Sequence, residues 1–152
     1  MKLKELTVAD LEMVKQLFLS VFSQDPWNDD WSDEEQLDRY IGDLLAHPRA
    51  LCFGLFDQKK LIGLSLGYIR YWYEGTEYRI EELCISRHYQ GRGIGQDFLK
   101  RIEEQLERRQ IVHILLQTER NLPAFSFYEK NGFRALEEDV TMVKKVGHHG
   151  TC

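Results

Sequence analysis

Residues 81–95 have the sequence EELCISRHYQGRGIG, in which an apolar stretch leads into three closely spaced glycines. The side chains of residues 78–85 are typical of a β-strand, and residues 94–106 repeat apolar side chains at helical spacing. A glycine loop between a strand and a helix suits a phosphate group, because glycine allows close approach and the N–H groups of the helix N-terminus attract an anion. We therefore expect residues 90–95 to bind phosphate.

The glycines also fit a plain turn that caps the following helix, and this alternative stays open. The loop is not a Walker loop, since no Gly-Lys-Ser/Thr sequence follows. Its spacing also differs from the G-x-G-x-x-G of dinucleotide-binding proteins. At a phosphate site, Arg87, His88 and Arg92 would add positive charge to the rim.

Capping boxes predict two helices in the first third of the chain. One begins at Thr7 and Asp10, and apolar residues at helical spacing continue it to about Phe22. The other begins at Ser32 and Glu35 and ends at a His-Pro step. A third helix is expected after the glycines. A fourth begins near an Asn-Leu-Pro sequence and ends at a Lys-Asn-Gly sequence, where glycine suits a left-handed cap.

Segments rich in β-forming residues predict the strands. The run at residues 111–117 is short and apolar throughout, so we expect it to be buried on both faces. The order predicts an α/β (α+β mixed) fold in a single domain over residues 1–152, with a central mixed sheet of about six to seven strands and about four flanking helices. The predicted strands are residues 51–56, 61–73, 78–85, 111–117, 133–136 and 140–146.

The composition is that of a globular protein, with 43% hydrophobic and 30% charged residues in 152. A net charge of −5 creates no basic field, so we expect no nucleic acid and no membrane as partner. No apolar signal segment or membrane span is present, which predicts a cytoplasmic protein. No metal site is expected: His148 and His149 are isolated, and Cys52, Cys84 and Cys152 lack ligand spacing and should be reduced thiols.

Two motifs resemble those of the GNAT acetyltransferase superfamily. The first is Q-x-x-G-x-G at Gln90, Gly93 and Gly95, directly after a strand. The second is the sequence NLPAFSFYEKNGF at residues 121–133, which is similar to the superfamily's N..A..FYEKNGF segment. The resemblance covers about residues 78–136. It implies a GNAT-like fold with a splayed pair of parallel strands, and an N-acetyltransferase that uses acetyl-CoA as co-substrate in a ternary complex.

The resemblance also implies where acetyl-CoA lies. Its pyrophosphate would rest on the glycine loop, its pantetheine arm beside the preceding strand, and its thioester in the gap between the two splayed strands. The cofactor-binding residues implied in this way are Leu83, Cys84, Ile85, Gln90, Gly91, Arg92, Gly93, Ile94, Gly95, Gln96 and Asn121.

Acetylation of an alkyl ammonium needs a base, because its pKa lies near 10.4. Glu81 and Glu82 are adjacent on a strand, so only one should face the substrate. The resemblance favours Glu81 and keeps Glu82 in reserve. Alternatively, either carboxylate only pairs with Arg70 or Arg79.

A proton donor is needed for the departing thiolate of CoA, and a strand N–H near Leu83 could stabilise the oxyanion. Tyr128 matches the superfamily tyrosine that lies near the sulfur, and its hydroxyl can donate a proton. Alternatively, Tyr128 is an aromatic core residue of an amphipathic helix.

Carboxylates and aromatic rings in residues 23–35 suit a cationic amine. We expect a small-molecule acceptor such as a polyamine, an aminoglycoside-like sugar or an amino-acid derivative. The alternatives are a solvated acidic loop, a protein lysine or N-terminal acetyltransferase, and an acetyl-CoA-binding module without activity; a homodimer stays open. The predicted substrate-binding residues are Trp27, Asp29, Asp30, Trp31 and Tyr71.

Overall fold

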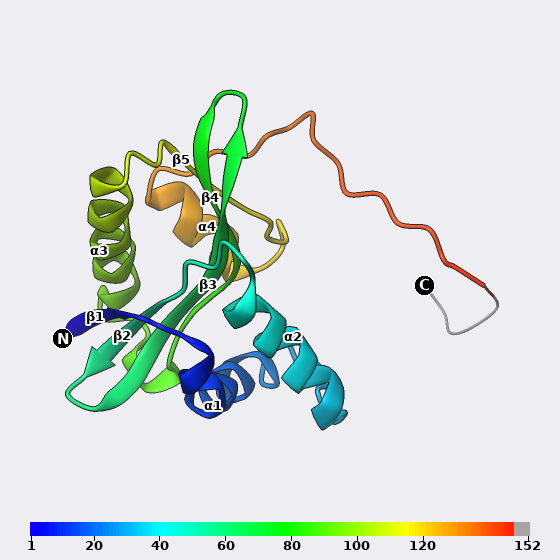
Figure 1. Ribbon diagram of the computed structural model, residues 1–152. Coiled ribbons are helices and arrows are strands. Elements are labelled where there is room, and N and C mark those ends of the chain that lie inside the picture. The colour runs from blue at the N-terminus through cyan, green and yellow to red at the C-terminus, as the bar shows by residue number, and fades with distance from the viewer. Residues whose placement is uncertain (148–152) are drawn as a thin grey trace. The chain divides into compact units, whose positions relative to one another are not determined.

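The computed structural model describes residues 1–147 in two compact units, of which the first is Met1–Thr118 and the second begins at Glu119 (Figure 1). The single domain over residues 1–152 stays a prediction, and His148, His149 and Cys152 lie outside the described residues. The first unit contains, in chain order, β1 (Lys2–Glu5), the 3₁₀ turn η1 (Val8–Asp10), α1 (Leu11–Phe22), α2 (Glu34–Ala46), β2 (Phe53–Asp57), β3 (Lys60–Trp72), β4 (Gly75–Ile85), the 3₁₀ turn η2 (Arg87–Tyr89), α3 (Ile94–Arg108) and β5 (His113–Leu116).

The five strands form one mixed sheet in the order β1-β2-β3-β4-β5. The first three pairings are antiparallel, and β5 is parallel to β4. This arrangement confirms the predicted mixed sheet with one parallel pair, although five strands are fewer than the six to seven expected. The sequence analysis missed β1, because only Leu3 of its four residues is even partly buried.

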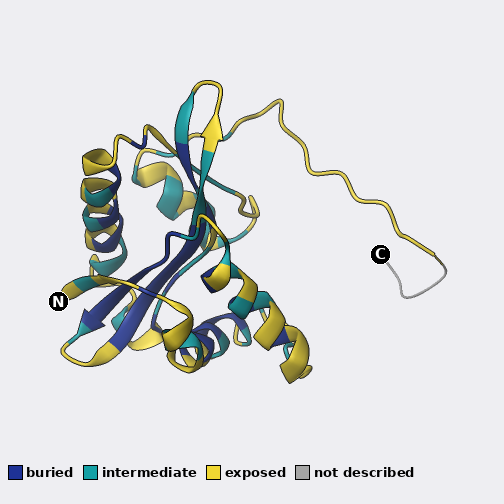
Figure 2. Ribbon diagram, in the orientation of Figure 1, coloured by how far each residue is buried: buried dark blue, intermediate teal, exposed yellow. Residues whose placement is uncertain are grey.

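Helices cover both faces of the sheet (Figures 1 and 2). The helices α1 and α2 pack on one face, where Phe18 and Ile41 join Leu64 and Leu66 of β3 in a buried cluster. On the other face, α3 packs through an apolar stripe into a second buried cluster that includes Tyr78 and Ile80 of β4. Burial of a large apolar side chain contributes about 1.5–3 kcal/mol, so these two clusters hold β3 and β4 firmly in the middle of the sheet.

The helix starts follow their capping residues. The box at Thr7 is confirmed: the Ala9 N–H donates to Thr7 Oγ1 at 3.3 Å, and the Thr7 N–H donates to Asp10 Oδ2 at 2.8 Å. The predicted box at Ser32 is wrong by one residue. Instead, Asp33 caps α2 by accepting a hydrogen bond from the Gln36 N–H at 3.1 Å.

The strand β5 is shorter and more exposed than predicted. Only His113–Leu116 are in the ladder; His113 is exposed and the other three residues are partly buried. The expected burial on both faces is therefore wrong. The four paired positions run from Glu77 opposite His113 to Ile80 opposite Leu116, and β4 continues beyond the end of this pairing to Ile85.

The second unit contains α4 (Pro123–Lys130), which ends as the sequence predicted. Gly132 has a φ of +91°, and the Phe133 N–H donates to the Tyr128 carbonyl oxygen at 3.0 Å while the Gly132 N–H donates to that of Glu129 at 3.2 Å. These two bonds form a Schellman motif. The rings of Tyr128 and Phe133 lie 5.3 Å apart and complete its apolar contact.

The two late strands predicted at residues 133–136 and 140–146 are not formed in the described part of the second unit. The apolar side chains that suggested them are exposed, with Val140 at 77% and Met142 at 87%. A β-forming sequence becomes a strand when its backbone and side chains find a partner, and residues 140–146 have no strand partner among the described residues.

Candidate active site

The glycine loop has the backbone that a phosphate site needs. Gly91 and Gly93 have positive φ angles of +77° and +75°, and a Cβ atom built on either would meet no atom within 4 Å. No side chain caps the N-terminus of α3, which follows Gly93 directly. The Gln90 side chain donates to the Ile85 carbonyl oxygen at 2.9 Å and ties the loop to the end of β4. The residues present therefore fit an anionic group at open, uncapped N–H donors.

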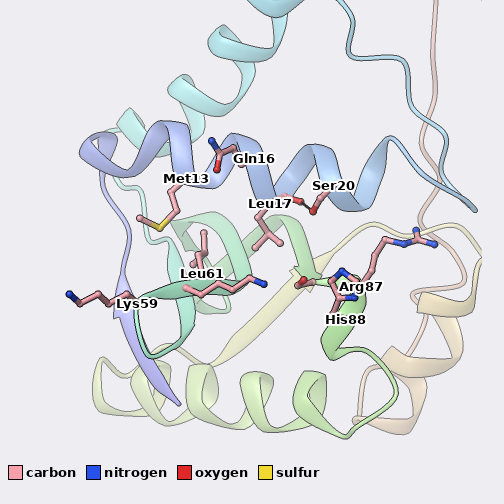
Figure 3. A pocket seen from close by; sticks show the side chains of 10 residues that line it. Met13, Gln16, Leu17, Ser20, Lys59, Leu61, Arg87 and His88 are labelled. Carbon is pink, nitrogen blue, oxygen red and sulfur yellow. Dashed lines mark hydrogen bonds between the residues drawn. The ribbon is translucent and has the colours of Figure 1, made fainter.

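The basic residues near the loop have partners. Arg87 donates from Nη1 to the Asp25 carbonyl oxygen at 2.8 Å, and the Arg92 guanidinium lies 5.5 Å from the centre of the Tyr89 ring. Arg87 and His88 also line a cavity of about 390 Å³ on the α1 face (Figure 3). No predicted catalytic or acceptor residue lines this cavity. Its other lining residues are Met13, Gln16, Leu17, Ser20, Lys59, Lys60, Leu61 and Ser86.

A β-bulge lies in β4 at Glu81. Leu66 of β3 pairs with Glu82, and its neighbour Gly67 pairs with Ile80, so Glu81 has no partner across the ladder. A bulge inserts one extra residue into a strand. Strict alternation of side chains along β4 is therefore broken at the two glutamates.

The bulge changes which residues face each cluster. Ile80 packs with the α3 cluster, and after the bulge Leu83 and Ile85 do so, whereas Cys84 belongs to the cluster under α1 and α2. Glu82 consequently lies on the α2 side of the sheet, where Tyr40 contacts it. Cys84 is buried as a free thiol whose pKa is raised by burial.

Glu82 is a partly buried carboxyl group held by a phenol. The Tyr40 hydroxyl donates to Glu82 Oε2 at 2.5 Å. Burial raises the pKa of Glu82 to about 7; the hydrogen bond from Tyr40 lowers it, and the negative charges of Glu81 and Asp29 raise it. The group can therefore take up and release a proton near neutral pH, as a general base must.

Glu81 has a different environment. It is exposed, and its Oε1 lies 3.5 Å from Nε of Arg79 on the same strand. The ion pair that the sequence analysis kept as an alternative thus exists for Glu81, along the strand rather than across it. Arg70 pairs with Glu77 at 3.2 Å and with neither of the two glutamates.

Two of the predicted acceptor residues lie close to Glu82. The ring of Trp31 stacks on that of Tyr40, with centroids 5.4 Å apart and an interplanar angle of 17°. The buried indole nitrogen of Trp31 has no hydrogen-bond partner in the part of the chain that the structure describes. Asp29 acts on Glu82 through its charge. Trp31 thus packs on the phenol that holds Glu82, and Asp29 adds negative charge near the carboxyl.

The other acceptor residues have contacts of their own. Trp27 packs edge-on against Phe22 at 5.1 Å. Hydrogen bonds from the Ser32 side chain and, at 3.0 Å, from the Ser32 N–H lower the pKa of Asp30. Tyr71 is 74% exposed on the β3–β4 hairpin. It lies five residues beyond the partner of Glu82 on β3, or about 17 Å along the strand.

The second unit holds Asn121 and Tyr128. Asn121 is exposed just before α4, and Tyr128 is partly buried within it. The Tyr128 ring packs edge-on against Phe127 at 5.6 Å and Phe133 at 5.3 Å. The roles of Asn121 and Tyr128 remain those implied by the resemblance.

The sequence analysis missed Tyr40. Its position in α2, between buried Leu37, Ile41 and partly buried Leu44, gives it the pattern of an ordinary core residue. A tyrosine on an apolar helix face needs a partner for its hydroxyl, and this requirement was the only indication in the sequence.

The chain belongs to the acetyltransferase (GNAT) family, whose model matches residues 11–133. This match confirms the resemblance and the GNAT-like fold. No curated protein sequence matches the chain.

Solved structures share the fold at low sequence identity. An aminoglycoside acetyltransferase, meta-AAC0020, from an uncultured soil metagenomic sample in complex with sisomicin has 20% identity and a TM-score of 0.73, with 96% of each chain covered. A possible acetyltransferase from Clostridium difficile 630 has 17% identity and a TM-score of 0.78, with 97% of this chain and 98% of that one covered. A ribosomal-protein-alanine N-acetyltransferase from Brucella melitensis biovar Abortus 2308 has 17% identity and a TM-score of 0.73, with 96% of this chain and all of that one covered.

Across residues 1–147, no helix is both long and apolar enough to cross a membrane. The same residues contain no group of three or more His, Cys, Asp or Glu side chains placed to hold a metal ion.

Proposed function

We propose that this acetyltransferase moves the acetyl group of acetyl-CoA to the primary amine of a small cationic molecule in a ternary complex. The observation that carries the proposal is the Glu82 carboxyl, which lies at a bulge, has a pKa of about 7 and contacts Tyr40. A base with this pKa is half ionised near neutral pH, where it can accept a proton from an ammonium group.

The glycine loop supports acetyl-CoA as the acetyl donor. Gly91 and Gly93 leave open space in front of the uncapped N-terminus of α3. That space would receive the pyrophosphate, while the activated thioester supplies the acetyl group. Leu83, Cys84 and Ile85 continue from the bulge to the loop and would guide the pantetheine arm, although Cys84 contributes only its backbone because its side chain is buried.

Glu82 is our candidate for the base in place of Glu81. Glu81 is exposed and paired with Arg79, whereas Glu82 is partly buried and held by the Tyr40 hydroxyl. In the proposed reaction Glu82 takes one proton from the ammonium, and the free amine attacks the thioester carbon. The carbon–sulfur bond then breaks, and Tyr128, in the role that the family resemblance implies, gives a proton to the thiolate that leaves. The nitrogen releases its second proton, which restores the Tyr128 phenol through water, so the products are the neutral amide and the CoA thiol, with one proton held by Glu82.

The surroundings of Glu82 support a cationic acceptor. Negative charge attracts an ammonium group, and Asp29 and Glu82 provide it. The aminoglycoside acetyltransferases among the structural relatives act on polycationic amines, as their names state, which agrees with this choice.

A protein N-terminus is the second candidate acceptor. The relative named as a ribosomal-protein-alanine N-acetyltransferase has the same fold at the same TM-score as the aminoglycoside enzyme. Fold similarity therefore does not separate the two acceptor classes, and only turnover can.

The test is an acceptor screen with purified protein and acetyl-CoA, in which a thiol reagent measures released CoA. The probes are sisomicin, spermidine and a peptide with N-terminal alanine. We expect release with one of the two small amines, and loss of that release in Glu82→Gln but not in Glu81→Gln. Turnover of the peptide alone would favour the second candidate. Tight binding of acetyl-CoA without turnover of any probe would favour a binding module and contradict the proposal.

A further inference from the structure

Tyr40 and Glu82 are joined across 42 residues of sequence. The Tyr40 hydroxyl donates to Glu82 Oε2 at 2.5 Å, from α2 to β4. Trp31 stacks on the Tyr40 ring, and the ring of Phe18 packs against it at 6.2 Å. These two contacts pack the ring in place, with its hydroxyl directed at the carboxyl group.

We propose that Tyr40 is a positioning residue that holds the Glu82 carboxylate in one orientation and favours its ionised form. This inference rests on the proposed function, in which Glu82 is the base. Burial raises the pKa of the Tyr40 phenol well above its usual range, so the phenol stays a donor. An ionised carboxylate only accepts hydrogen bonds and therefore suits a phenol that donates one. A protonated carboxyl has an O–H group of its own, which needs a separate acceptor.

The groups around Glu82 shift its pKa in opposite directions. Burial and the charges of Glu81 and Asp29 all raise its pKa. The Cys84 side chain, two residues along β4, stays a neutral thiol because burial raises its pKa, and the facing residue of β3 is Leu66. Among the described residues that shift the pKa of Glu82, only Tyr40 lowers it. Without that bond the carboxyl would stay protonated to higher pH, so at neutral pH a smaller fraction of it could take a proton.

The first test needs no acceptor. The carboxyl carbon of Glu82 is followed by NMR as a function of pH in protein labelled with ¹³C-glutamate, with Glu82→Gln to assign the resonance. Tyr40→Phe should raise the Glu82 midpoint by about one pH unit, since a hydrogen bond to a charged group is lost. Tyr78→Phe is the matched control. Its hydroxyl is also buried, lies 2.8 Å from Ser65 Oγ, and belongs to the α3 cluster, so this variant should leave the midpoint unchanged.

The second test is kinetic and uses sisomicin or spermidine, whichever the acceptor screen finds active. The acid limb of kcat/KM should move to higher pH in Tyr40→Phe by the same amount as the NMR midpoint, while Tyr78→Phe should leave it in place. A merely structural hydroxyl would lower stability without moving this limb. An unchanged midpoint in folded Tyr40→Phe would overturn the inference.

If Tyr40→Phe does not fold, the wild-type protein still gives an answer. The ¹³Cζ resonance of Tyr40 should shift with the same midpoint as the Glu82 carboxyl, because the phenol donates to the group that titrates. Independent behaviour of the two resonances would refute the inference. Failure of the proposed function is distinct: there Glu82→Gln would keep full activity, whatever the NMR midpoints.

Discussion

Replacing Glu82 with glutamine should remove a pH-dependent destabilisation of the folded protein. The pKa of Glu82 is about 7, against 4.5 for an ordinary glutamate, so between these values the folded state holds a proton that the unfolded state has released. Because the folded state binds more protons, the free energy of unfolding falls as pH rises through this range. At about 1.4 kcal/mol for each pKa unit, the loss is at most about 3 kcal/mol.

Glutamine keeps an oxygen that can accept the hydrogen bond from Tyr40, but it has no charge to bury. Urea unfolding at about pH 5 and pH 8 measures the effect. The wild-type protein should lose more stability between these values than Glu82→Gln, by up to about 3 kcal/mol. Glu81→Gln is the control, because Glu81 is exposed and paired with Arg79. It should keep most of the pH dependence, since it removes only the smaller contribution of the Glu81 charge to the raised pKa of Glu82. Parallel pH dependence in the wild type and Glu82→Gln would refute the assignment of a raised pKa to this carboxyl.

Three substitutions test the loop, the bulge and the proton donor. Gly93→Asp should abolish binding of acetyl-CoA in calorimetry while Gly42→Asp does not, because both glycines have open space at Cβ but only Gly93 lies at the uncapped end of α3. Gly67→Ala should lower the free energy of unfolding by about 1–3 kcal/mol, since its Cβ would lie 2.2 Å from the Arg79 carbonyl oxygen; an unchanged urea midpoint would show that the bulge relaxes freely. Tyr128→Phe should keep the affinity for acetyl-CoA and lower kcat by about ten- to a thousandfold in the thiol-release assay, and full activity would remove Tyr128 from the mechanism.

Much of the fold follows from local patterns in the sequence. Periodicity and capping signals predicted the four α-helices, and β-forming composition predicted β2, β3, β4 and β5. The positions of the glycines predicted the loop before α3 and the cap at Gly132. These features depend on neighbouring residues, so a single sequence contains the information. The prediction of the two late strands was wrong for the opposite reason, because a strand depends on a partner elsewhere in the chain.

At the candidate site, too, the sequence predicted what depends on neighbouring residues and missed what depends on distant ones. The sequence indicated the two glutamates, but alternation along an ideal strand could not reveal the bulge at Glu81, which depends on the register of β3 against β4. The environments of the two groups then differ: Glu82 has Tyr40 and a raised pKa, and Glu81 has Arg79. Tyr40 could not be predicted as a partner, since a hydrogen bond between α2 and β4 is a tertiary contact.

The pH dependence of kcat/KM with two acceptors tests the central claim most directly. The acceptors should have amines of different pKa, because free amine also becomes more abundant as pH rises. We expect a limb near pH 7 in the wild type that stays fixed between the two acceptors and is absent in Glu82→Gln. A limb that follows the acceptor's pKa, or that persists unchanged in Glu82→Gln, would contradict the role of Glu82 as the base.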